Sequence, residues 1–115
     1  MLRKILLLLF GACLLAPIAK AEEAADDAKV SVHLNGVGGL TCAHWRSSSA
    51  ARAEGTVWIF GFWSGLNYVA AATQQPQSNA PEKEIVAEVV RVCMANPSQV
   101  LASAAWAAYL NLSKQ

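Results

Sequence analysis

Four side chains in this sequence could bind a metal ion, or act as a nucleophile with its base: His33, Cys42, His44 and Cys93. The Cys-x-His spacing of Cys42 and His44 is unlike the ligand spacing of known zinc sites. Two residues that stand two apart on a helix also point in different directions, so these two make a poor thiol–imidazole pair. We therefore predict no metal site and no cofactor.

A second candidate is the segment Gly61–Phe62–Trp63–Ser64–Gly65, which is close to the turn that presents a catalytic serine. That turn requires Gly-x-Ser-x-Gly, whereas here the serine comes one position late. No strand-like run precedes the segment, and the aspartates, Asp26 and Asp27, both lie in an acidic start. The sequence predicts a protein that is not an enzyme, with no catalytic residue and no small-molecule substrate.

Residues 1–21 have the pattern of an export signal. Arg3 and Lys4 precede an apolar run of about 11 residues, and Ala19–Lys20–Ala21 fits the small-x-small rule for cleavage. The alternative is a lipoprotein signal with Cys13 as the lipidated residue, although the apolar run continues past that cysteine. We expect a signal peptide that is removed after residue 21.

The charge of the chain changes when this signal is removed. The whole sequence has nine basic and eight acidic residues, with a formal charge of +1. Without Arg3, Lys4 and Lys20, six basic residues remain against eight acidic ones, and the net charge is near −2. This balance excludes the basic surface by which proteins bind nucleic acid.

Two cysteines, Cys42 and Cys93, remain in the exported part. An even pair in an oxidising compartment predicts a disulfide. A disulfide between these two cysteines would close the loop from residue 42 to residue 93. In the chain-entropy model, closing a loop of this length stabilises a fold by about 4 kcal/mol, which is a large share of the stability of a small domain.

The stretch 56–73, TVWIFGFWSGLNYVAAAT, predicts a central helix, because it is too long for one strand and contains no proline. We expect Thr56 to cap this helix and its aromatic residues to be buried on most sides. Its length approaches that of a membrane span, but its small and polar residues argue against one. Gly61 and Gly65 are predicted to let a neighbouring helix approach closely.

Three further helices are expected after residue 39. A short one over 40–45, capped by Thr41, places Cys42 and Trp45 on one face. The next begins at a capping box over 79–82 and ends near Cys93. Its inner face is predicted to contain Ile85, Val86, Val89, Val92 and Cys93, while Glu88 and Arg91 can pair on its surface.

The last helix is expected to begin at the cap signal 96–99 and to run to the C-terminal region. Its buried side is predicted to contain Val100, Leu101, Ala104, Ala105, Ala108 and Leu112, broadened by Trp106, Tyr109 and Leu110. The many alanines indicate close packing between helices.

The region before these helices, 22–39, is interpreted as an acidic and extended arm. Its first part is polar and alanine-rich, 30–34 alternates like a short strand or an extended segment, and 35–39 is a turn. The expected organisation is a signal peptide (1–21), this arm (22–39) and one helical domain (40–115).

Three short motifs resemble those of the HdeA/HdeB-like superfamily of small periplasmic helical proteins. They are Thr41–Cys42–Ala43–His44–Trp45, the run from Gly61 to Asn67, and Val92–Cys93 followed by Asn96–Pro97. The resemblance covers about residues 40–112. It implies a periplasmic protein with an all-α fold, a small four-helix orthogonal bundle in which one disulfide joins the first and third main helices.

The acid chaperones of that superfamily bind unfolding clients through apolar helix faces at low pH, and their neutral form is a dimer. The resemblance thus implies an acid-stress chaperone, and Trp58, Phe62, Trp63 and Tyr68 are the candidate surface for clients, a partner or a second copy. Related families are immunity proteins against type VI amidases, which implies the alternative of a module that neutralises a periplasmic toxin. This chain has fewer charges than the acid chaperones, so the fold transfers better than the function.

Overall fold

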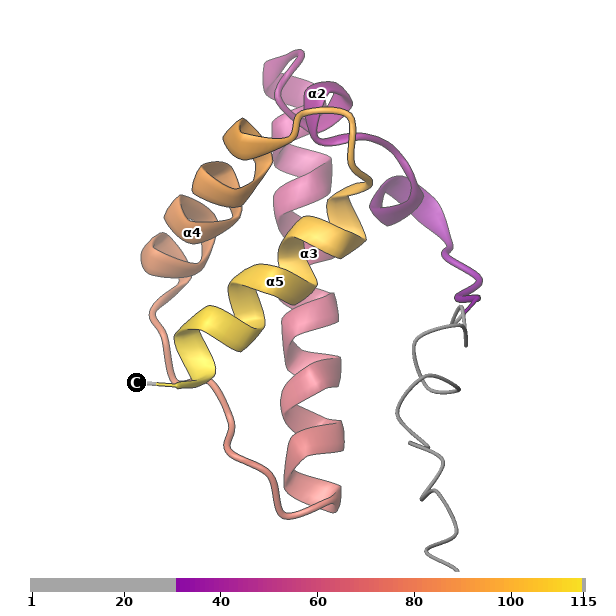
Figure 1. Ribbon diagram of the computed structural model, residues 1–115. Coiled ribbons are helices and arrows are strands. Elements are labelled where there is room, and N and C mark those ends of the chain that lie inside the picture. The colour runs from indigo at the N-terminus through magenta and orange to yellow at the C-terminus, as the bar shows by residue number, and fades with distance from the viewer. Residues whose placement is uncertain (1–30, 115) are drawn as a thin grey trace, which may run out of the picture. The chain divides into compact units, whose positions relative to one another are not determined.

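The computed structural model describes residues 31–114, and over this range the chain is all-helical. A short 3-10 helix, η1 (Gly36–Gly39), precedes four α-helices, which are α2 (Cys42–Trp45), α3 (Ser49–Ala72), α4 (Glu82–Ala95) and α5 (Leu101–Ser113) (Figure 1). The predicted all-α fold with one disulfide is confirmed for these residues, none of which belongs to a strand. The expected signal peptide, and the arm as far as residue 30, lie outside the described range.

The long helix α3 begins at Ser49, well before the predicted cap Thr56. The hydroxyl of Ser48 caps it by accepting a hydrogen bond from the backbone N–H of Ala51 at 3.0 Å. Gly55 does not break the helix but lies buried inside it, beneath Trp45. The predicted cap is therefore wrong, because the residues from 49 to 54 are mostly good helix formers that carry the helix past the glycine.

The start of α4 also differs from the prediction, since the capping box over 79–82 does not form. The N-cap is Pro81, whose carbonyl accepts hydrogen bonds from the N–H groups of Glu84 and Ile85 at 2.9 and 3.0 Å. The side chain of Asn67 on α3 exchanges two hydrogen bonds of 3.0 Å with the backbone of Ser78. This pairing fixes the linker against α3, so the helix begins only after it.

The final helix, α5, begins at Leu101 and not within the predicted cap signal 96–99. Thr41 and Val100 form an isolated antiparallel bridge, and the N–H of Leu101 donates to the carbonyl of Leu40 at 2.8 Å. Because residue 100 pairs with this earlier segment, it stays extended and the helix starts immediately after it.

The core is arranged around α5, which packs against both α3 and α4 (Figure 1). The rings of Trp63 on α3 and Tyr109 on α5 meet edge to face, with centroids 5.0 Å apart. The inner faces predicted for the last two helices are largely confirmed, since all their members are buried or partly buried except Trp106 and Leu110, which are exposed. The buried residues of these two helices are Ile85, Val89, Cys93, Leu101, Ala102, Ala104, Ala105, Ala108, Tyr109 and Leu112.

Candidate functional site

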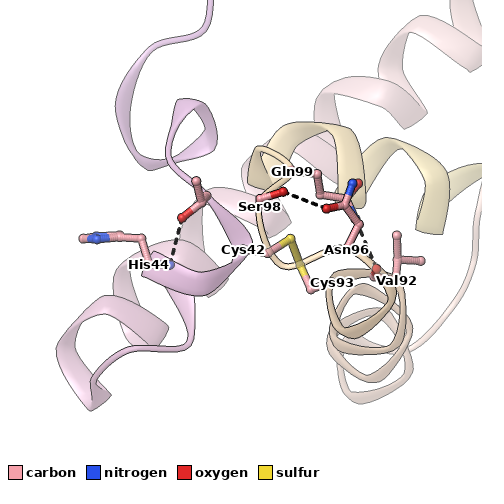
Figure 2. Close-up of a disulfide and its surroundings, with 8 residues drawn as sticks. Cys42, His44, Val92, Cys93, Asn96, Ser98 and Gln99 are labelled. Atoms are coloured by element: carbon pink, nitrogen blue, oxygen red, sulfur yellow. Dashed lines mark hydrogen bonds between the residues drawn. A yellow bond between two sulfur atoms is a disulfide. The ribbon is translucent and has the colours of Figure 1, made fainter.

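The predicted disulfide between Cys42 and Cys93 is present and joins α2 to α4 (Figure 2). Both cysteines are buried, and their Cα atoms lie 5.4 Å apart. Next to this bond, the N–H of Cys42 donates to the carbonyl of Gln99 at 2.9 Å, and the side-chain amide of Gln99 donates to the carbonyl of Val92 at 3.1 Å. The crosslink is therefore structural. Hydrogen bonds also connect the residues around it to Gln99, which precedes α5.

The two histidines lie apart from these sulfurs. His44 is exposed, and its ring points away from the disulfide, as Figure 2 shows. His33 is exposed as well. In residues 31–114 no three histidine, cysteine or acidic side chains come together as a metal site would require.

The aromatic residues predicted to form one surface on α3 are divided by the fold. Trp58 stacks on Phe62, with ring centroids 5.0 Å apart, and both are only partly exposed. The indole N–H of Trp58 donates to the carbonyl of Asn35 at 3.1 Å. The same ring lies on Gly38 of η1, where a Cβ would come within 2.0 Å of it. The segment before α2 therefore covers Trp58.

The other two aromatic residues lie in opposite environments. Trp63 is buried in the core, with 3% of its surface exposed, whereas Tyr68 is 78% exposed. Of the four residues predicted as a contact surface, only Tyr68 is largely open to a partner of this folded chain.

Gly61 and Gly65 do not pack against any of the other helices that the structure describes. A Cβ built on either residue meets no atom within 4 Å, and both residues are exposed. The prediction that they admit a neighbouring helix is wrong within residues 31–114, where the close approaches occur at Gly38 and Gly55 instead. The reason is that α5 packs on the face of α3 that contains Trp63, and not on the glycine face.

An apolar groove of about 380 Å³ lies between α3 and α5, and we call it the α3–α5 groove. Leu66 and Val69 of α3 and Trp106 and Leu110 of α5 form its walls. The buried residues Ala70 and Tyr109 also line it. The groove is an apolar concavity of the size of a ligand site, which makes it the default candidate for a binding site.

The sequence pattern did not reveal this groove, because Trp106 and Leu110 were expected on the buried side of the last helix. They are 46% and 40% exposed. With Val69, which is 58% exposed, they leave a large apolar area open to solvent along the groove. Only one signal in the sequence could have indicated the groove. Small alanines already fill the core face of the last helix, so its tryptophan, Trp106, has no room there.

Among the residues that the structure describes, one ion pair forms on α4, between Glu88 and Arg91, and a hydrogen bond connects Glu88 to α5. Glu88 accepts hydrogen bonds from the guanidinium of Arg91, as predicted, and from the side-chain amide of Asn111 on α5 at 3.0 Å. The hydrogen bond from Arg91 holds the pKa of Glu88 below its usual value against the opposing effect of burial, and Asn111 lowers the pKa further.

The described residues thus offer a binding surface and a structural crosslink. No helix within them has the length and apolarity that a bilayer crossing requires. No protein-family model, no curated protein and no solved structure matches this chain.

Proposed function

We propose that this protein is a non-enzymatic periplasmic binding protein of the HdeA/HdeB-like type, which holds unfolding clients through the apolar surface along the α3–α5 groove. The proposal includes an export signal at residues 1–21 and an orthogonal arrangement of the four helices. The observation that carries it is the exposed apolar area formed by Val69, Trp106 and Leu110. Open apolar areas of this kind usually serve protein contacts.

The hydrogen bond between Asn111 and Glu88 supports a role under acid stress. When Glu88 is protonated, its ion pair with Arg91 is lost and its hydrogen bond from Asn111 is weakened. The hydrogen bond from Asn111 connects α4 to α5, so acid weakens the contact of α4 with the helix that carries Trp106 and Leu110. More of the apolar surface around the groove then becomes available to a client.

The experiment compares client aggregation with and without the protein between pH 2 and 4. The variant L110R introduces a charge into the surface, and M94R is its matched control, because Met94 is an exposed apolar residue on α4 that does not line the groove. We expect wild type and M94R to suppress aggregation and L110R to lose most of this effect. A protein that protects no client in this range contradicts the proposal.

The alternative is a module of the immunity type, in which the same surface would bind one folded partner. The two functions differ in breadth: a holdase protects several unrelated clients, whereas an immunity protein protects none of them. Suppression of aggregation for at least two unrelated clients therefore supports the holdase and excludes the alternative as the main activity.

A further inference from the structure

The α3–α5 groove has the size of a small-molecule site. Its volume of about 380 Å³ lies within the range of about 300–1,000 Å³ that is common for ligand pockets. An apolar protein cavity of about 150 Å³ holds one benzene ring, so this open groove has room for an alkyl chain of roughly ten carbons. The walls formed by Leu66, Val69 and Trp106 suit such a chain, because they carry no charge.

Polar residues are placed at only one part of the groove. Thr73 and Gln75 lie at the C-terminal end of α3. Ser113 and Lys114 lie at the C-terminal end of α5. Among the described residues that line the groove, only Lys114 is charged. Within residues 31–114, it forms no ion pair with another side chain.

The C-terminal ends of helices carry partial negative charge, which would oppose an anion. At this end of α3, however, the carbonyls already accept hydrogen bonds: Val69 from the N–H and hydroxyl of Thr73 at 3.0 and 2.8 Å, and Ala70 from the N–H of Gln75 at 2.8 Å. On α5, the carbonyl of Tyr109 accepts from the hydroxyl of Ser113 at 2.6 Å. Part of the negative end of each helix is thus satisfied by hydrogen bonds, and Lys114 is the positively charged side chain at this end of the groove.

We propose that the α3–α5 groove binds a free, single-chain amphiphile with a carboxylate head, a medium-chain fatty acid. The alkyl chain lies along Leu66, Val69 and Trp106, and the carboxylate pairs with Lys114. Charge complementarity selects a carboxylate over a neutral or cationic head of the same chain length. This ligand occupies the same groove as the client proposed above, but its binding does not depend on the protein acting as a holdase.

The first test is calorimetric titration of the purified protein at pH 7 with decanoate, decanol and decyltrimethylammonium, all below the concentrations at which they form micelles. We expect decanoate to bind with one-to-one stoichiometry and more tightly than the other two. Octanoate should bind about fifteenfold more weakly than decanoate, because it has two CH₂ groups fewer and each buried CH₂ contributes about 0.8 kcal/mol. No saturable binding of decanoate, or equal affinity for all three heads, overturns the proposal.

The second test uses two matched pairs of variants. V69R should abolish the binding of decanoate, whereas V57R should not, since Val57 is exposed on the same helix but lies outside the groove. K114E should weaken decanoate binding about three- to fivefold, as expected for a solvent-exposed ion pair, without changing decanol binding. K83E, a change of an exposed lysine on α4, should alter neither. Equal losses in V69R and V57R, or in K114E and K83E, place the binding elsewhere and overturn the proposal.

Discussion

At the scale of single residues, the glycines of α3 differ in what surrounds them. A Cβ on Gly55 would lie 2.2 Å from Cδ1 of the buried Trp45, whereas a Cβ on Gly61 or Gly65 meets nothing within 4 Å. We expect G61A and G65A each to raise the free energy of unfolding by about 1 kcal/mol, because alanine is the better helix former. G55A should lower it by about 1–3 kcal/mol through overpacking.

Urea unfolding of the three glycine variants and the wild type measures these changes directly. An equal effect of all three substitutions would contradict the assigned surroundings of the glycines. If G61A and G65A prove destabilising, then something outside residues 31–114 packs against this face of α3.

Glu88 is the residue whose protonation should change the stability of the fold. Its pKa is lowered in the folded state, so its contribution is present above the unfolded pKa of about 4.3 and is lost as the pH falls through the lower folded value. We expect E88Q to be less stable than wild type at pH 7 and equally stable near pH 2. E84Q is the control, because Glu84 is an exposed acid on the same helix.

Urea unfolding at both pH values tests this expectation. A stability difference between E88Q and wild type that is the same at pH 7 and pH 2 would show that the loss does not arise from the charge of Glu88.

At the scale of elements, the start of α3 depends on one serine. Ser48 accepts a hydrogen bond from the N–H of Ala51, whereas Thr56 lies inside the helix. We expect S48A to lower the free energy of unfolding by about 1 kcal/mol. T56A should change it by no more than about 0.5 kcal/mol, and upward, because alanine has the higher helix propensity. Urea unfolding distinguishes the two, and a larger loss for T56A would restore the predicted cap.

The inner faces of the helices could be predicted from the sequence, but their starts could not. Apolar periodicity depends on the residues of one helix, so Ile85, Val89 and Cys93 were placed correctly. The starts of α4 and α5 depend on contacts with distant segments, such as Asn67 with the linker and Leu40 with Leu101. A cap motif read along the chain cannot show that such a contact holds the same residues extended.

The candidate groove could not be predicted from the sequence, for a related physical reason. It is formed where two helices diverge, so it depends on how α5 lies against α3 and not on the pattern of either helix. Trp106 and Leu110 are apolar and flanked by small residues, which favours a buried interpretation. Their exposure follows from the packing of α5 through Ala104, Ala105 and Ala108, which fill its inner side.

At the scale of the whole molecule, the disulfide is the largest single contribution that we can assign. Cys42 and Cys93 are 51 positions apart, and α2 has only four residues with which to hold its place. We expect the double substitution C42A/C93A to lower the free energy of unfolding by about 4 kcal/mol. Urea unfolding of this variant, and of the wild type with and without reductant, measures it. A reductant that leaves the wild-type midpoint unchanged would contradict the expectation.

The crosslink also makes a covalent ring that contains α3 and α4 but excludes α5, the helix at the centre of the core. A single cut of the backbone should therefore give different products on a denaturing gel, depending on where it falls. A cut between α3 and α4 yields two fragments that separate only after reduction, because each retains one of the paired cysteines. A cut between α4 and α5 releases the C-terminal peptide without any reductant, since packing alone retains it.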